Sequence, residues 1–190
     1  AMGLRNTTTG WGWLARLLHW SIAGIILFML GLGYYMTEIV TDVFEQFPLF
    51  QTHKSWGFTV FILALIRIVW RLVNPAPALP DHMSGLERLA AHAGHLALYG
   101  LMFAMPISGW LMSSASPLQD LYGIQNMVFD LFEMPDPFIP GDSDLEELFS
   151  SIHYWCSWGL TLVLAAHVGA ALKHHFINKD NVLRRMLKGD

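Results

Sequence analysis

Charged side chains are scarce in this chain of 190 residues: Asp, Glu, Lys and Arg together make up 14% of it, against about 25% in soluble domains. Apolar residues account for 54%, so a water-soluble domain is disfavoured and lipid is the expected solvent. Cysteine is also scarce, and the single Cys156 excludes an intrachain disulfide. The first ten residues are polar and no small-residue cleavage site follows the first apolar run, so we expect no cleavable signal peptide.

Four long apolar runs occupy much of the chain. Each is close to the roughly 20 residues that a helix needs to cross the hydrocarbon core of a bilayer. Backbone polar groups in lipid have to be paired within their own segment, so these runs are helices rather than open sheet. We expect an all-α, integral membrane, up-and-down four-helix bundle that forms one domain over residues 1–190, with an outer loop at about 113–143. The helices are expected at about 14–36, 56–73, 89–112 and 152–172.

Charge is distributed unevenly between the two sides of this bundle. Nine basic residues lie at the N-terminus, in the connection after the second helix and at the C-terminus, whereas the two other connections carry eleven carboxylates and Lys54 alone. Because positively charged loops stay in the cytoplasm, we expect both termini to be cytoplasmic and the acidic connections to be outside. Residues 118–132 mix apolar and acidic side chains, which favours a short helix on the membrane surface. We expect the lipid bilayer as a partner and no nucleic acid.

Four histidines lie at matched depths of these helices. His19 is near the cytoplasmic end of the first helix, and His53 opens the second at the outer side. His153 and His167 share the fourth helix, fourteen positions and therefore roughly 21 Å apart along its axis. Fourteen steps leave their rings about 40° apart around the helix, so both face one interior seam. The spacing predicts two pairs, His19 with His167 and His53 with His153.

Two pairs of imidazoles across a membrane are typical of two haems, each with a histidine at both axial positions. Such iron has no site for exogenous ligands and changes little on reduction, which makes the chain a path for electrons. A lone intramembrane histidine is as readily explained as a satisfied polar group of the bundle, although ionisable groups in lipid are costly and tend to be functional. Four histidines at matched depths favour ligation of haem iron.

Four further side chains lie at the depth of the inner pair. His92 and His95 are three positions apart and share a face of the third helix; they would bind a haem propionate or a quinone carbonyl, or hold helices together. No carboxylate lies near them in the sequence to complete a metal site. Arg67, deep in the second helix, and Arg16, three residues before His19, are each either a propionate partner or an anchor that reaches the interface.

Several longer stretches match a known family. The chain resembles the bacterial cytochrome b561 family, four-helix membrane cytochromes with two b-type haems, over about residues 11–187. The matching pieces are Leu18-His19-Trp20, the Arg67…Arg71…Pro75-Ala76-Pro77 exit of the second helix, Leu89-Ala90-Ala91-His92-Ala93-Gly94-His95-Leu96, the His153…His167 pair, and His174-His175-Phe176-Ile177-Asn178-Lys179-Asp180-Asn181-Val182-Leu183. The resemblance implies a bacterial inner-membrane protein that exchanges electrons with ubiquinone or another quinone. It also implies two haems b, with the axial ligands His19, His53, His153 and His167.

The outer surface departs from what one activity of this family requires. That well-described activity is oxidation of superoxide at the outer face with reduction of ubiquinone. Superoxide is an anion and would be steered by a positive surface, whereas the outer connections carry eleven carboxylates. Lys54 adjoins the proposed outer ligand His53 and is the candidate outer-face contact for an anion. The broad field instead suits a cationic redox protein.

These observations predict a quinone-linked oxidoreductase that passes electrons through both haems between quinone and a partner at the outer face. Superoxide oxidation is one version of this function. A second interpretation is a non-catalytic cytochrome b that transfers electrons within, or anchors, a larger redox complex. A third is a histidine-lined metal transporter without haem; the lack of acidic residues within the spans counts against it.

Overall fold

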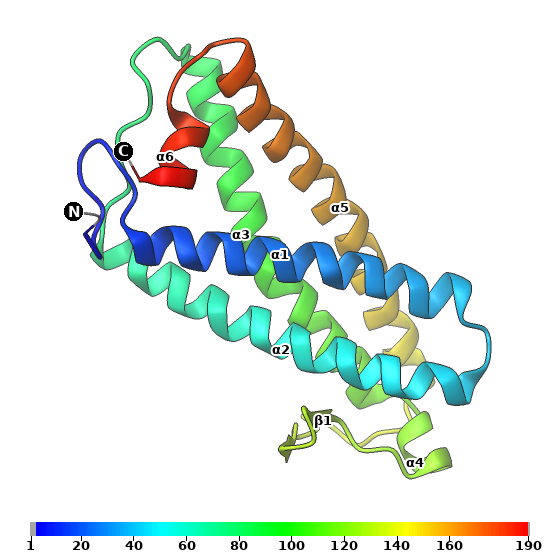
Figure 1. Cartoon of the computed structure of the whole chain (residues 1–190). Helices are drawn as coiled ribbons and strands as arrows, with labels where there is room; N and C mark the ends of the chain where they lie inside the picture. The colour runs from blue at the N-terminus through cyan, green and yellow to red at the C-terminus, as the bar shows by residue number, and fades with distance from the viewer. Residues whose placement is uncertain (1–2, 190) are drawn as a thin grey trace. The chain divides into compact units, whose positions relative to one another are not determined.

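The computed structural model describes residues 3–189, and most of these residues are helical (Figure 1). Within that part of the chain the long helices are α1 (Trp13–Tyr34), α2 (Val43–Val73), α3 (Gly85–Ala115) and α5 (Ser143–Phe176). A π-helical turn, η1 (Tyr35–Ile39), extends the first. The shorter elements are α4 (Leu118–Tyr122), the strands β1 (Met127–Val128) and β2 (Phe132–Glu133), and α6 (Val182–Lys188).

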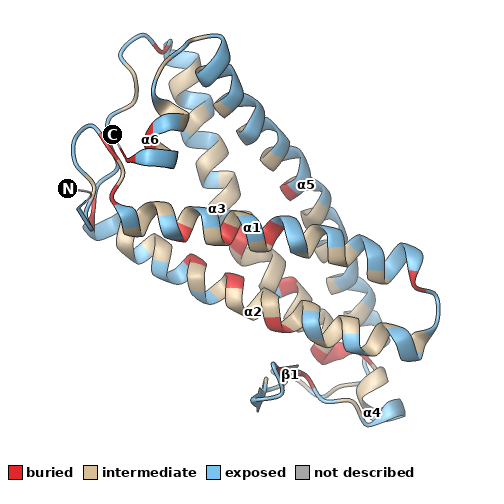
Figure 2. Cartoon of the chain, viewed as in Figure 1, coloured by how far each residue is buried: buried red, intermediate tan, exposed pale blue. Residues whose placement is uncertain are grey.

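The long helices are long and apolar enough to cross a membrane. In the most apolar 18-residue window of each, only 6–17% of the residues are buried within the protein. Figure 2 shows the same distribution: buried residues are sparse, and intermediate or exposed residues cover most of each helix. Large apolar side chains in such numbers avoid water, so lipid covers them. The expected all-α membrane bundle is confirmed: the chain is a helical membrane protein.

Three of the long helices begin earlier than their apolar runs because polar caps set their starts. Oδ1 of Asp42 accepts from the backbone N–H groups two and three residues later at 2.8 and 3.2 Å, so α2 begins at Val43 rather than near residue 56. Asp142 caps α5 in the same way at 3.1 and 3.0 Å. Before α3, Ser84 and Glu87 form a capping box, in which each side chain accepts from the other residue's backbone N–H. These caps and the polar side chains among the early residues of the three helices interrupt the apolar pattern, which explains the late sequence-based starts.

The connection between α3 and α5 contains a short helix and a hairpin, and the expected surface helix over 118–132 is wrong beyond its first turn. Gly123 follows α4 with a φ of 63°, the left-handed conformation that ends helices. The strands β1 and β2 then pair antiparallel around a turn in which Phe129 and Asp130 have φ angles of 47° and 55°. Two consecutive positive φ angles belong to a tight hairpin turn that follows the twist of the strands. The positive φ angles at these positions therefore end the helix and form a hairpin, although the mixed apolar and acidic composition favoured a longer surface helix.

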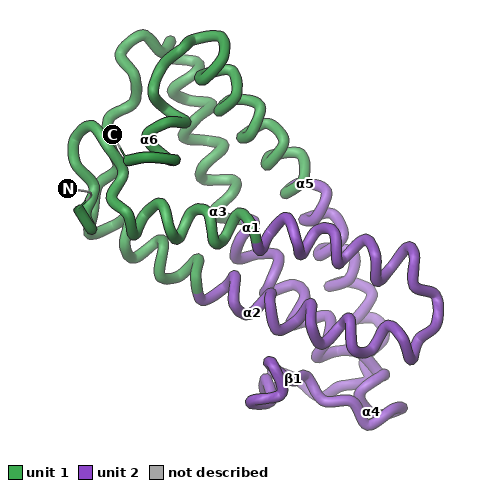
Figure 3. Tube along the Cα trace, viewed as in Figure 1, with its two compact units in different colours: residues 1–24, 63–100, 160–190 green, residues 25–62, 101–159 purple. Residues whose placement is uncertain are grey.

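Two compact units make up the described chain (Figure 3). Each of the long helices α1, α2, α3 and α5 contributes one segment to the first unit and one to the second. The first unit comprises residues 1–24, 63–100 and 160–190, and the second comprises 25–62 and 101–159.

Hydrogen bonds join segments that are far apart in the sequence within each unit. In the first, the buried guanidinium of Arg185 in α6 donates to the carbonyl oxygens of Thr9 and Ala78 at 3.1 and 3.0 Å. These bonds join α6, the N-terminal segment and the connection after α2. In the second, the hydroxyl of Ser55 in α2 accepts from the backbone N–H of Phe129 at 2.9 Å, which holds the hairpin against α2.

Candidate functional site

The first unit brings together His19 of α1 and His167 of α5. Their ring centroids are 6.1 Å apart, and the ring planes lie at 45°. The neighbouring Trp20 ring lies edge-on to His19 at 4.9 Å. The indole N–H of Trp20 donates to the carbonyl oxygen of Met186 at 3.0 Å, which anchors this turn of α1 to α6.

The second unit brings together His53 of α2 and His153 of α5. Their ring centroids are 6.3 Å apart, with an interplanar angle of 78°. Gly109 leaves room beside His153, because a Cβ there would lie 3.1 Å from Cε1 of that ring, whereas a Cβ at Gly33 would make an ordinary contact, 3.5 Å from Cε1 of His53. Both sequence-predicted pairs are therefore brought together by the fold, and α5 supplies one imidazole to each.

The separation within each pair fits one metal ion bound between two imidazole nitrogens. With a metal–nitrogen bond of about 2 Å on each side, ring centroids lie roughly 6 Å apart, close to the observed 6.1 and 6.3 Å. Two axial imidazoles are a donor set that suits haem iron. In addition, Nδ1 of His53 is buried and has no hydrogen-bond partner among residues 3–189. Buried polar atoms of native proteins rarely lack a partner, so this nitrogen is consistent with a group bound beside His53.

A serine on α3 orients the ring of His153. The buried hydroxyl of Ser108 donates to the carbonyl oxygen of Met105 at 3.0 Å and lies 2.9 Å from Nδ1 of His153. A hydroxyl has one proton to donate, so the Nδ1–H of His153 donates to Oγ of Ser108. Nε2 of the neutral ring is then unprotonated and has a lone pair for a metal. Hydrogen bonds of this kind fix the tautomer and the direction of ligating histidines.

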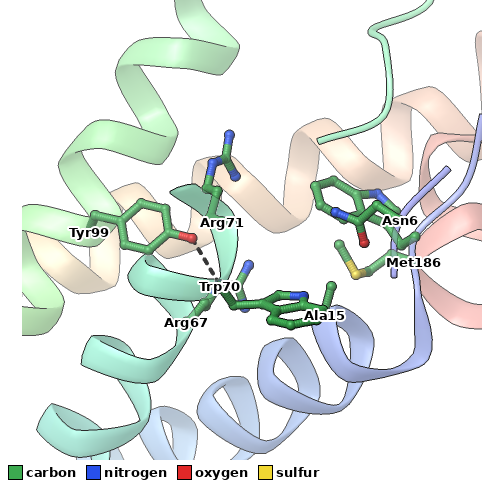
Figure 4. Close-up of a pocket in the computed structure, with 8 residues that line it drawn as sticks. Asn6, Ala15, Arg67, Trp70, Arg71, Tyr99 and Met186 are labelled. Carbon is green, nitrogen blue, oxygen red and sulfur yellow. Dashed lines mark hydrogen bonds between the residues drawn. The ribbon is translucent and has the colours of Figure 1, made fainter. Parts of the chain in front are cut away.

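A guanidinium on α2 contacts the other pair. Arg67 donates through Nη2 to Nδ1 of His19 at 3.2 Å and through Nε to the hydroxyl of Tyr99 at 3.1 Å, the bond drawn in Figure 4. The guanidinium of Arg71 lies over the same tyrosine ring, 5.8 Å from its centroid. Arginine only donates, so Nδ1 of His19 accepts and the proton of the neutral ring is on Nε2. Metal binding through Nε2 of His19 therefore requires Arg67 to release Nδ1 and take another partner.

A pocket of the first unit lies beside Arg67 (Figure 4). Nε1 of Trp70 in its wall is buried and has no hydrogen-bond partner within the described part of the chain. The pocket has a cavity volume of about 20 Å³, so together with the guanidinium donors it suits the carbonyl or carboxylate end of a ligand rather than a whole ring. The pocket is lined by Asn6, Trp11, Ala15, Arg67, Trp70, Arg71, Tyr99 and Met186.

The other candidates of the first unit lie apart from one another. His95 lies against His167, with 5.6 Å between ring centroids, so three imidazoles gather here. His92 is exposed one turn earlier on α3 and is not brought to the pair. Arg16 donates through Nη1 to the carbonyl oxygen of Leu187 at 2.9 Å, which ties α1 to α6.

Lys54 belongs to a hydrogen-bond network of the second unit. Its Nζ donates to Oδ1 of Asn126 at 2.7 Å, and the hydroxyl of Ser113 donates to the same oxygen at 2.6 Å. The side-chain amides of Asn126 and Gln119 donate to Oδ1 of Asp136 at 3.4 and 3.3 Å. The ammonium group is therefore half-buried and directed at the connection between α3 and α5.

Comparison with known proteins gives a match over nearly the whole chain, because the family described as prokaryotic cytochrome b561 matches residues 10–189. The chain belongs to the prokaryotic cytochrome b561 family. It is 35% identical over 188 residues to cytochrome b561 homolog 2 of Escherichia coli K12, covering 98% of this chain and 95% of the relative. It is 31% identical to cytochrome b561 homolog 1 of the same organism over 138 residues, covering 72% and 73%. It is also 31% identical to the probable superoxide oxidase CybB of Yersinia pestis over 137 residues, covering 71% and 72%.

Membership of the cytochrome b561 family indicates which group the histidines bind. The chain is a multi-pass membrane cytochrome of a family that binds b-type haem. The family resemblance expected from the sequence motifs is confirmed. The interpretation as a haem-free metal transporter is therefore wrong.

Four residues that contact or adjoin the site of this cytochrome are missing from the sequence-based set: Ser108, Tyr99, Trp70 and Asn126. Tyr99 follows His95 by one helical turn, so a search for polar side chains on the histidine-bearing face would find it. The contact of Ser108 with His153 joins positions 45 apart, and nothing in the local pattern marks it.

Proposed function

We propose that this cytochrome holds two haems b, one between His19 and His167 and one between His53 and His153. We further propose that it passes electrons between a quinone and a partner at the outer face. The observation that carries the proposal is the matched separation of the imidazoles, 6.1 Å in one pair and 6.3 Å in the other. Bound haem iron supplies one-electron transfer.

The distribution of charge supports an orientation in the bacterial inner membrane. Ten of the eleven basic residues and four of the fifteen acidic residues belong to the first unit, whereas Lys54 and eleven acidic residues belong to the second. Because positively charged segments stay in the cytoplasm, we assign both termini to the cytoplasmic side. The acidic connections after α1 and α3 are assigned to the outer side.

The chain's own groups prepare each pair for its haem. Ser108 holds the His153 ring with Nε2 free, and Gly109 leaves room beside that ring. Arg67 is assigned to a haem propionate, because ligation by His19 requires its guanidinium to leave Nδ1 and a guanidinium binds a carboxylate through two parallel hydrogen bonds. Tyr99 keeps Arg67 close through the hydrogen bond to Nε.

The pocket of the first unit is the proposed contact for a carbonyl group of the quinone. A quinone carbonyl accepts hydrogen bonds, and Nε1 of Trp70 is a buried donor without a partner in the described chain. The guanidinium of Arg71 adds a charged donor on the same wall. His95, in contact with His167, is a second hydrogen-bonding group on this side and is assigned to the quinone or to a propionate.

Superoxide oxidation is the version of this function supported by the similarity to the probable superoxide oxidase of Yersinia pestis. Two superoxide anions each lose one electron to become dioxygen, and the two electrons with two protons reduce one ubiquinone to ubiquinol. The eleven carboxylates of the second unit repel an anion. They favour instead a small cationic redox protein, whose charge would complement the acidic connections.

Salt and Lys54 distinguish the two partners. Haem reduction in the purified, haem-loaded protein is followed with superoxide or with a reduced basic cytochrome c, from about 10 mM to about 200 mM salt. Steering of a cationic protein predicts a rate that falls about tenfold or more over this range. Superoxide as partner predicts a rate that does not fall with salt and that drops in Lys54→Gln but not in the control Lys188→Gln.

Quinone reactivity is tested in the same preparation. Ubiquinol should reduce the haems, or reduced haems should be reoxidised by ubiquinone, and Trp70→Phe should slow this exchange because it removes the indole N–H while keeping a flat ring. A protein with both haems that exchanges electrons with no quinone would contradict the proposal. That result would favour the non-catalytic subunit of a larger complex.

A further inference from the structure

We propose a second kind of metal site in the first unit, a site for a divalent transition-metal ion formed by His82, His174 and Asp180. Among residues 3–189, this is the group of His, Cys, Asp and Glu side chains whose three candidate ligand atoms all lie within 4.8 Å of one another. His82 lies in the connection between α2 and α3, His174 near the end of α5, and Asp180 in the turn before α6. A metal bound there would join these three segments. The site is separate from the haem-binding pairs.

The carboxylate of Asp180 lies near the spacing of a zinc site from each of the two histidines, and the two histidine nitrogens lie within 4.8 Å of each other. Oδ2 of Asp180 lies 3.2 Å from Nε2 of His82 and 2.6 Å from Nδ1 of His174. Ligand atoms bound at about 2 Å in a tetrahedron lie roughly 3.3 Å apart. The contact of Asp180 with His82 therefore fits as it stands, and the contact with His174 has to open by less than about 1 Å. The two histidine nitrogens, at most 4.8 Å apart, have to approach each other by up to about 1.5 Å.

The surroundings of Nδ1 of His174 favour a cation. This nitrogen faces two groups, the carboxylate of Asp180 at 2.6 Å and Nδ2 of Asn178 at 3.2 Å. One ring nitrogen cannot donate to the first and accept from the second at the same time. Turning the amide of Asn178 by half a rotation, a change that leaves its shape the same, presents its oxygen instead. A cation would then meet an imidazole nitrogen, a carboxylate oxygen and an amide oxygen together.

The charge balance selects a transition metal rather than calcium or magnesium. One carboxylate is too little for an oxygen-seeking cation beside Lys179 and Arg184, which line the adjoining pocket. Two imidazoles and one carboxylate suit Zn²⁺ and its neighbours.

Exposure of His82 makes the site accessible to an ion from solution. The side chain of His82 is 51% exposed, whereas those of His174 and Asp180 are 12% and 11% exposed. Two ligands are thus held within the fold, and the third closes over the ion from the connection between α2 and α3. Binding should therefore fasten this connection to the C-terminal segment and raise the Tm of the cytochrome.

The test uses the haem-loaded full chain, stripped of metal with EDTA and titrated with Zn²⁺ alone by calorimetry. We expect one Zn²⁺ per chain and a rise in Tm, with haem absorbance unchanged throughout. His82→Ala should weaken binding at least about tenfold and abolish the rise in Tm. Asp180→Asn should do the same. His175→Ala is the matched control, because His175 is an exposed neighbour of His174 in the sequence and lies outside the group.

A spectroscopic readout separates ligation from indirect effects on folding. With Cu²⁺ in place of Zn²⁺, electron paramagnetic resonance should show two coordinated imidazole nitrogens in the wild type and one in His82→Ala. Equal Zn²⁺ affinity in the wild type and His82→Ala would overturn the proposal, as would a loss of binding in His175→Ala alone. Either outcome would mean that the three side chains form histidine–aspartate hydrogen bonds and no metal site.

Discussion

At the scale of single residues, Ser108 fixes the tautomer and the orientation of the imidazole of His153. Replacing Ser108 by Ala removes the acceptor of the Nδ1–H, which makes the imidazole less basic and its ring less fixed. We expect Ser108→Ala to raise the reduction potential of the haem of the second unit and to release that haem about tenfold faster. Redox titration and haem transfer to a scavenger protein measure the two effects.

Ser114 offers a matched control for this substitution. It is buried on the same helix, and its hydroxyl has no hydrogen-bond partner in the described part of the chain. Ser114→Ala should leave both the potential and the rate of haem release unchanged. Equal effects of the two substitutions would show that Ser108 acts through packing alone.

Gly109 sets the space beside the same ring. A Cβ there would lie 3.1 Å from Cε1 of His153, closer than an ordinary contact, and the atom belongs to a ring that has little freedom to move. Gly109→Ala should therefore lose the haem of the second unit and keep that of the first, as measured by haem content per chain. Gly100→Ala on the same helix meets no atom within 4 Å and should keep both haems. Full haem content in Gly109→Ala would contradict the claim that the ring of His153 has little freedom to move.

The residues that sequence alone predicts are those tied to helical periodicity. The two histidine pairs follow from the fourteen-residue spacing on α5, because fourteen residues are close to a whole number of turns. Ser108 and Asn126 act through contacts between positions 45 and 72 apart, which no periodicity carries. His92 and His95 have suitable spacing, yet only His95 contacts His167, since their neighbours on other helices decide which ring turns inward.

At the scale of secondary-structure elements, Asp42 fixes where α2 begins. Its side chain accepts from two backbone N–H groups of the first turn, so Asp42→Ala should lower the free energy of unfolding by about 1 kcal/mol. Asp42→Asn keeps an oxygen acceptor at the same place and should remain close to the wild type. Thermal unfolding of the two variants in the same detergent measures the difference. Equal loss in both would assign the effect to charge rather than to capping.

Hydropathy predicts that the four long helices exist and misses where three of them start. It detects apolar side chains that face lipid, whereas the starts of α2, α3 and α5 are set by the capping residues Asp42, Ser84 and Asp142. It also misses the hairpin of β1 and β2, whose turn depends on two positive φ angles at Phe129 and Asp130. Asp tolerates a positive φ but Phe rarely adopts one, so the turn at Phe129 could not be predicted from residue type.

At the scale of the whole molecule, two properties stand out: lipid covers the long helices, and the two units differ in charge. The apolar surfaces of the long helices are covered by the bilayer rather than by other parts of the protein. The first unit carries nearly all of the basic residues and the second carries most of the acidic ones. This asymmetry is readable from the sequence alone, because it depends on order along the chain and not on side-chain contacts.

The central claim, two haems held by four histidines, is tested most directly by haem content per chain from the pyridine haemochrome spectrum. We predict two b-type haems in the wild type and one in each of His19→Ala and His153→Ala. Two should remain in His95→Ala, although His95 lies only 5.6 Å from His167, and in His175→Ala. A single haem in the wild type, or a haem lost in His95→Ala and kept in His19→Ala, would contradict the assignment of ligands.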